Sequence, residues 1–277
     1  DAIDIAGGTQ QVMAWVFPTI YHEKGMFTSY AGQVRQAVSI PVLVSGRMQE
    51  LEFAESVLEK GEADFISFAR PLIADPDLAN KLKAGEGECV RRCVGCNHCI
   101  GVRIWNNNTL RCAINPLAGR ESRYPQGVGR TDVKKHVAVI GGGAAGCEAA
   151  YTAALRGHEV DLYERASELC GGQVKLASAP PCKDILHHIP KFFTAVFAKM
   201  ENVHVHLNTE MTVEDVKSLK ADAVLLATGG QIFVPGIPGV KGNPNVIPAD
   251  KVLDGTEKLT GKVLIAGGGQ IGIETAH

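Results

Sequence analysis

Four cysteines in one short stretch carry the most specific chemical pattern in this sequence. Cys93, Cys96 and Cys99 follow one another at three-residue intervals, and Cys112 comes after twelve further residues. Runs of this kind hold Fe–S clusters through cysteine thiolates. Three closely spaced thiolates can wrap one side of a cubane, and a more distant fourth can close it. The spacing therefore predicts a 4Fe–4S cluster.

Zinc is the main competing interpretation, because four thiolates also suit a tetrahedral zinc ion. Zinc ribbons, however, use two separate Cys-x-x-Cys pairs rather than a triplet and a single cysteine. A disulfide framework fits less well, since the triplet is closely packed and nothing indicates secretion. Cys89 is interpreted as a spare thiol, and His98 as a residue near the cluster rather than a ligand, because four cysteines already complete the set.

A glycine-rich turn in the second half predicts a dinucleotide site. A strand is expected over 136–140 and a helix over 144–156, with a second strand over 159–163. A Gly-x-Gly-x-x-Gly pattern lies between the first strand and the helix, and an acidic residue follows eighteen positions after its last glycine. This combination is typical of dinucleotide binding. We expect FAD, or ADP, to contact Gly141, Gly143, Ala145, Gly146 and Glu164.

The same pattern recurs 126 residues later, at Gly267, Gly269 and Gly272, after an expected strand over 262–266. In each turn the first glycine makes the bend, the second admits the pyrophosphate, and the third lets the helix pack on the strand. Two such turns predict two nucleotides, with NAD(P)H in the second. The choice between NADH and NADPH stays open, because the residue that decides it lies beyond His277.

The first third of the chain alternates expected strands and helices. Strands over 1–6, 41–45 and 64–68, with helices over 29–38 and 49–60, predict parallel βα units. Functional groups of such folds lie at the carboxyl ends of the strands. Gly46-Arg47 and Ala69-Arg70 occupy two successive strand ends, where backbone N–H groups and guanidinium groups suit a phosphate. The alternative is that both arginines pair with surface carboxylates.

Composition narrows the classes of protein and partner. The 277 residues are 45% apolar and 21% charged, with a net charge of −2, which disfavours a nucleic-acid groove or a polybasic membrane patch. There is no run of eighteen apolar residues to cross a membrane. Eight cysteines without a secretory signal suggest a reducing cytoplasm. The expected partner is a small-molecule substrate, with self-association into a homo-oligomer left open.

Several stretches resemble one family of flavoenzymes. Phe68–Leu78 is similar to the end of an old-yellow-enzyme barrel, which implies that Gly46, Arg47, Ala69 and Arg70 hold an FMN phosphate, with alanine at Ala69 in place of the usual glycine. Cys93–Arg120 resembles the cluster segment of the trimethylamine dehydrogenase and 2,4-dienoyl-CoA reductase group. Leu169–Val174 and Thr228-Gly229 look like FAD-contacting elements of pyridine-nucleotide reductases, which implies FAD contacts at Gly172, Gln173, Thr228 and Gly229.

The resemblance implies an α/β chain with four parts. These are the C-terminal part of an FMN-binding (β/α)8 barrel (1–85), a cluster segment and linker (86–130), a Rossmann-like FAD domain (131–259) and the start of an NAD(P)H domain (260–277). The chain starts without an initiator methionine and is expected to be an internal fragment. The implied activity is that of an oxidoreductase in which electrons pass from NAD(P)H to FAD, the cluster and FMN, and then to an activated alkene of the enone or dienoyl type.

Three other functions stay open. The two-residue gap between Cys96 and Cys99 resembles the amine dehydrogenase branch, whereas the intact second glycine turn argues for a reductase. A FAD and Fe–S electron-transfer module, like the small subunit of glutamate synthase, and a zinc-stapled binding module are the others. No catalytic residue is assigned, since Tyr21 and His22 fit an ordinary loop. Ile104 and Trp105 are expected to shield the cluster from water.

Overall fold

The computed structural model describes residues 1–277 apart from the side chain of Ile104. The chain divides into two compact units, Asp1–Gly127 and Val128–His277. Each unit contains its own parallel sheet. The four finer boundaries expected from the sequence stay a prediction.

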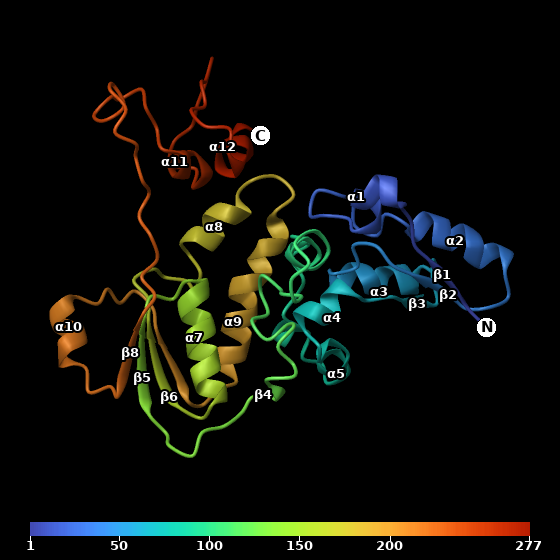
Figure 1. Ribbon diagram of the computed structural model, residues 1–277, viewed down its shortest axis with the longest axis horizontal. Helices are drawn as coiled ribbons and strands as arrows, with labels where there is room; N and C mark the ends of the chain where they lie inside the picture. The colour runs from blue at the N-terminus through green and yellow to red at the C-terminus, as the bar shows by residue number, and fades with distance from the viewer. The chain divides into compact units, whose positions relative to one another are not determined.

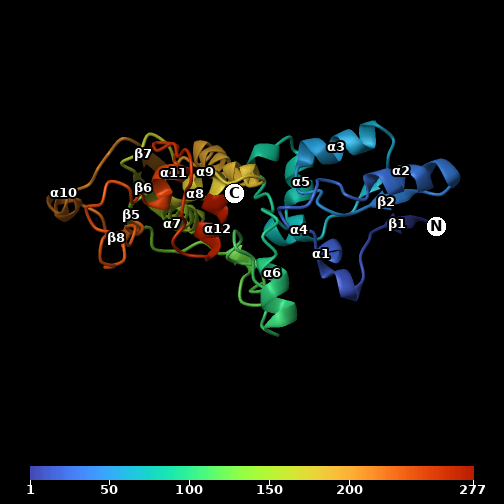
Figure 2. The same ribbon diagram turned by 90° about the horizontal axis from the view of Figure 1, so that it is seen from above.

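The first unit is built on three short parallel strands in the order β1-β2-β3. Val42 and Val44 of the central strand are fully buried, and they pack with Ala31 and Val57 from the two helices that connect the strands. This continuous apolar strand is what a parallel sheet with covered faces requires. Figure 2 shows the two helices beside the strands. The elements are β1 (Ile3–Ile5), α2 (Thr28–Ala37), β2 (Val42–Val44), α3 (Leu51–Glu59) and β3 (Phe65–Ile66).

Short helical pieces surround this sheet. Two of them lie in the stretch before Thr28, which the sequence predicted to be a loop. The others follow β3 and lead into the cysteine-rich segment. In order they are η1 (Gln10–Val12), α1 (Met13–Val16), α4 (Arg70–Ala74), α5 (Leu78–Lys83), η2 (Gly87–Cys89), α6 (His98–Ile100) and the π-helical turn η3 (Gly101–Trp105), before strand β4 (Pro125–Val128).

The second unit contains a four-stranded parallel sheet in the order β7-β6-β5-β8. Val139, Val160 and Leu162 are fully buried in its central strands. Figure 1 shows α7 and α9 side by side on one face of this sheet. The elements are β5 (His136–Ile140), α7 (Ala144–Leu155), β6 (Glu159–Tyr163), α8 (Gln173–Ser178), η4 (Asp184–His187), α9 (His188–Ala198), β7 (Val203–His206), α10 (Val213–Ser218) and β8 (Ala223–Leu226).

The end of the chain corrects one expectation. Residues 262–266, predicted to be a strand, form no regular element and pair with no strand in the described part of the chain. Leu264 is 94% exposed, so the segment lacks both the ladder hydrogen bonds and the packing that define a strand. Helices α11 (Ala249–Leu253) and α12 (Gln270–Ala276) flank it. Among the described residues, no helix has the length and apolar character to cross a membrane.

Candidate cofactor and cluster sites

The cysteine segment is fastened to the residues that follow β3. Arg70, the first residue of α4, donates from Nη1 to the side-chain oxygen of Asn97 and, over 2.6 Å, to the carbonyl of Pro18. Asn97 lies between two of the predicted ligands, and its Nδ2 donates to the carbonyl of Phe17 over 2.6 Å. The cysteine loop is thereby tied both to α4 and to the segment after α1.

The same short helix holds the remaining parts of the cysteine segment. Asn115, three residues after Cys112, donates from Nδ2 to the carbonyl of Ile73 over 2.9 Å. Asp75, 4% exposed, accepts the backbone N–H of Arg91 over 2.8 Å and the ammonium of Lys81 over 2.7 Å. Three points around α4 therefore position the entry to the segment, the cysteine triplet and the fourth cysteine.

The four predicted ligands differ in burial. Cys99 is buried, Cys93 and Cys112 are half-buried, and Cys96 is exposed. Burial raises the pKa of the Cys93 thiol to about 11; the Gly95 N–H and the charge of Arg70 oppose this rise, and the neighbouring Cys112 and Cys96 add to it. Burial also raises the pKa of Cys99, with Cys112 and Cys96 again contributing. Cys96 and Cys112 therefore lie close enough to Cys93 and Cys99 to influence their ionisation.

The chemistry of the four side chains is what suits a cluster. Cysteine thiolates are the ligands of 4Fe–4S clusters, and they also suit a tetrahedral zinc ion. Among the residues whose side chains are described, no group of three or more His, Cys, Asp or Glu side chains is already arranged to hold a metal ion. The donor set itself consists of cysteines alone. The 4Fe–4S assignment stays a prediction.

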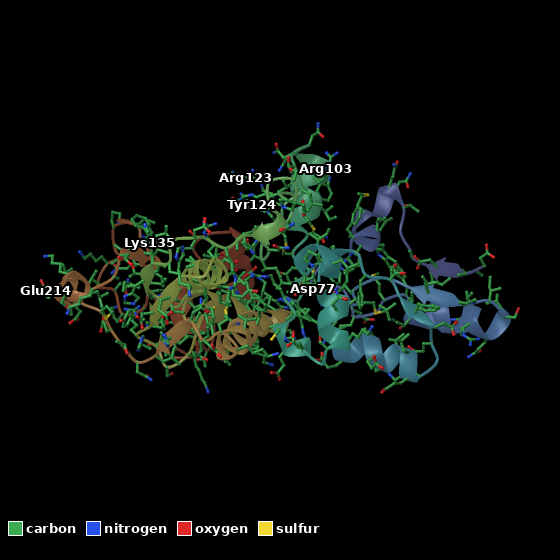
Figure 3. All side chains as sticks on the ribbon, turned by 90° about the horizontal axis from the view of Figure 1, so that it is seen from below. Asp77, Arg103, Arg123, Tyr124, Lys135 and Glu214 are labelled. Atoms are coloured by element: carbon green, nitrogen blue, oxygen red, sulfur yellow. The ribbon has the colours of Figure 1, made fainter. Side chains whose placement is uncertain are left out.

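The predicted shielding of the cluster by Ile104 and Trp105 stays a prediction. Trp105 is 61% exposed, and the side chain of Ile104 lies outside the described residues. Figure 3 labels Arg103 on the same turn.

The expected phosphate residues lie at the strand ends, as predicted, but their arginines already have partners. Gly46 has a positive φ of 98°, which few side chains tolerate. Arg47, 6% exposed, donates from Nη1 to the carbonyls of Ile20, over 2.7 Å, and His22. Ala69 is exposed. A phosphate contact from Arg47 or Arg70 stays a prediction.

The first glycine turn has the shape that the pattern requires. Gly141 has a φ of 106°, and a Cβ there would lie 2.4 Å from the carbonyl oxygen of Ala227. A Cβ on Gly146 would lie 1.8 Å from the carbonyl oxygen of Gly141, so α7 packs directly on the turn. Gly143, by contrast, faces open space, with nothing within 4 Å of an added Cβ. The turn is closed where protein packs and open where a pyrophosphate is expected.

The other predicted FAD residues surround this turn or lie beside open space. Glu164, at the end of β6, accepts the Gly142 N–H over 2.6 Å and the Ala166 N–H over 2.8 Å. If Glu164 also contacts a ribose, its carboxylate binds the ribose and the glycine turn at the same time. Gly172 and Gly229 face open space, and Gly229 has a φ of 78°. The FAD contacts expected from Ala145, Gln173 and Thr228 stay predictions.

The second glycine turn repeats the first. Gly267 has a φ of 118°, and a Cβ on Gly272 would lie 2.0 Å from the carbonyl oxygen of Gly267. Gly269, with φ −75° and ψ −179°, matches Gly143, with φ −71° and ψ 179°, and also faces open space. The repetition arises although 262–266 pairs with no strand, so the turn is specified locally.

Two buried thiols close to the first glycine turn were missed from the sequence. Cys147 is fully buried at the start of α7 and Cys170 is 2% exposed before the Gly171-Gly172 turn. Cys147 donates from Sγ to the carbonyl of Gly142 over 3.1 Å. The proximity of the two thiols raises the pKa of Cys147 and lowers that of Cys170. Their separation in the sequence gave no signal of it.

One carboxylate on the sheet binds two imidazoles. Asp161 accepts from Nε2 of His136 and from Nε2 of His206, each over 2.5 Å. The bond to Asp161 raises the pKa of His136; the two histidines hold the pKa of Asp161 below its usual value although burial opposes them. The sequence placed His204 and His206 on a polar face at the edge of a sheet, and β7 is an edge strand. The role of Asp161 was missed.

Two family models match the chain. Residues 2–88 match the NADH:flavin oxidoreductase / NADH oxidase family. Residues 135–277 match the pyridine nucleotide-disulphide oxidoreductases. The cysteine triplet and Cys112 lie between the two matched regions.

Similar proteins include reductases and an oxidase. The chain is 39% identical to an NADH oxidase of Thermoanaerobacter brockii over 99% of its length, and this covers 42% of that protein. It is 35% identical to a cinnamate reductase of Clostridium sporogenes over its whole length, covering 40% of that protein. A structure of 2-naphthoyl-CoA reductase with 2-naphthoyl-CoA superposes with a TM-score of 0.91 at 30% identity, over 99% of this chain and 41% of that one. The chain thus spans about two fifths of the length of these relatives.

Proposed function

The chain belongs to the NADH:flavin oxidoreductase / NADH oxidase family and carries a pyridine nucleotide-disulphide oxidoreductase module, and we propose that it joins the two halves of a multi-cofactor reductase. The complete enzyme takes electrons from NADH or NADPH and delivers them to an activated alkene of the enone or dienoyl type. Bound FMN, FAD and a 4Fe–4S cluster would supply the hydride and single-electron chemistry.

In this proposal the described residues bind and position these groups. The residues at the ends of β2 and β3 hold the FMN phosphate, and the four cysteines hold the cluster. The first glycine turn and Glu164 hold FAD, and the second turn holds NAD(P)H.

The second glycine turn is the observation that carries the proposal. Its backbone repeats the first turn, and Gly269 leaves the same open approach as Gly143. An amine dehydrogenase that passes electrons to a partner protein has no need of a nicotinamide site. The names of the NADH oxidase and cinnamate reductase relatives support NADH as the reductant and a conjugated acid as the kind of substrate.

An amine dehydrogenase is the second candidate. The two-residue gap between Cys96 and Cys99 favours it, because that spacing resembles the trimethylamine dehydrogenase branch. The two candidates predict opposite directions of electron flow at FMN, so a reduction experiment separates them.

The test uses the full-length protein under anaerobic conditions. Iron and sulfide analysis should give about four of each per chain. NADH or NADPH should bleach the flavin absorbance within seconds, and addition of a cinnamate-type alkene should restore it. Bleaching by a methylated amine and by neither nucleotide would establish the second candidate instead. Stoichiometric zinc without iron would contradict both.

A further inference from the structure

We propose that Arg70 connects the FMN phosphate site to the cluster loop, and that Asn97 is the residue that positions its guanidinium. This inference rests on the proposed function, because it requires both FMN and the cluster to be present. It adds that the two sites are coupled through one side chain. Loading of the phosphate site and the properties of the cluster should then depend on each other.

Asn97 has the geometry of a positioning residue. It adopts a left-handed conformation, with φ 55°, between Cys96 and Cys99. Its amide is bonded at both ends: the nitrogen donates to Phe17 and the oxygen accepts from Arg70. A side chain held at both ends, on a backbone conformation that few residues adopt, has little freedom to move.

Arg70 has donors left for an anion. Both of its hydrogen bonds, to Pro18 and Asn97, use Nη1, so within the described part of the chain Nε and Nη2 are not engaged. A guanidinium offers five N–H groups in a planar fork, which allows one edge to bind protein and another to bind phosphate. Arg70 follows Ala69 at the end of β3, where the FMN phosphate is expected.

The charge of Arg70 also acts on the ligands. Its guanidinium is bonded to the side chain of Asn97, the residue directly after Cys96, so a positive charge lies beside the cysteine loop. A positive charge near a cluster stabilises the extra electron of its reduced form. Displacement of the guanidinium should therefore lower the reduction potential of the cluster. Because coupling between two binding sites is reciprocal, it should also weaken FMN binding.

The test compares Asn97→Gly with Asn107→Gly in the full-length protein. Glycine keeps the left-handed conformation at residue 97, so the variant removes the amide without backbone strain. Asn107 is an exposed asparagine beyond the triplet with a similar φ of 47°, and it serves as the matched control. For Asn97→Gly we expect FMN to bind about ten- to a hundredfold more weakly, from the loss of one hydrogen bond to a charged group. The midpoint potential of the cluster, followed by EPR, should fall, and the control should match the wild type in both.

A double-mutant cycle with Arg70→Lys isolates the coupling. Lysine keeps the charge but not the fork, so Arg70→Lys alone should weaken FMN binding, and adding Asn97→Gly should cause little further loss. Additive losses would overturn the link. A wild-type FMN affinity and a wild-type cluster potential in Asn97→Gly would also overturn the link. If that variant loses iron, its FMN affinity alone decides the question. A wild-type protein that binds no FMN or no cluster would instead overturn the proposed function.

Discussion

Replacing Gly146 by alanine should disrupt the second unit, whereas replacing Gly143 by valine should leave the fold intact and abolish FAD binding. Both glycines belong to the first turn, three residues apart. Only their surroundings differ. A Cβ at Gly146 would lie 1.8 Å from the carbonyl oxygen of Gly141, and a Cβ at Gly143 would meet nothing within 4 Å.

The size of each effect follows from these distances. A carbon and a carbonyl oxygen approach to about 3.3 Å at the closest, so Gly146→Ala forces α7 away from the turn by about 1.5 Å. Overpacking in a rigid core costs about 1–3 kcal/mol, and a clash with backbone that cannot rotate away exceeds this. A loss of about 4 kcal/mol removes much of the stability of an ordinary domain. At Gly143 the backbone is extended, with φ −71°, so valine fits and only a helix-cap preference of about 1 kcal/mol is lost.

Limited proteolysis and flavin analysis separate the two outcomes. In Gly146→Ala, sites within 128–277 should become sensitive to protease, and FAD should be absent. In Gly143→Val the protease pattern should match the wild type, while FAD is lost and FMN is retained. FAD retention in Gly143→Val would place the nucleotide elsewhere, and a protease-resistant Gly146→Ala would refute the close packing of α7 on the turn.

Three further outcomes are expected. Cys112→Ser should lose iron and sulfide in chemical analysis, whereas Cys89→Ser should keep both; equal loss in the two variants would contradict the ligand set. Gly269→Val should abolish flavin bleaching by NADH and NADPH in stopped flow while dithionite still reduces the flavins, and rapid bleaching would remove the second turn from the nicotinamide site. Asp161→Asn should lower the thermal unfolding midpoint most between pH 3.8 and 6.5, the ordinary pKa values of the aspartate and of His136. Because the pKa of His136 is raised in the folded protein, this stabilisation is lost as the pH rises through the raised pKa. Because the pKa of Asp161 is lowered, the stabilisation is also lost as the pH falls through the lowered pKa. A difference in unfolding midpoint that does not change with pH would contradict the interaction between Asp161 and His136.

The regular elements around the first glycine turn were predictable because their signals are local. The strands at 136–140 and 159–163 were placed correctly to the residue, since each is a short apolar or alternating run next to a glycine turn. The glycine geometry was equally local, because a positive φ and a close helix contact leave few other residues usable. The strand at 262–266 failed because a strand also requires a neighbour, and the chain supplies none there.

The supports of the cysteine segment could not be predicted, because they join residues far apart in the sequence. Asn97 bonds to Phe17 across 80 positions, and Asn115 bonds to Ile73 across 42. Nothing in the composition near an asparagine marks which distant carbonyl it will meet, since that depends on how α4 is placed after β3. The predicted cluster ligands can be recognised from the spacing of the cysteines, whereas the amides that hold the cysteine segment in place are specified by the fold. Variants at such amides therefore test the arrangement of the site without removing a single ligand.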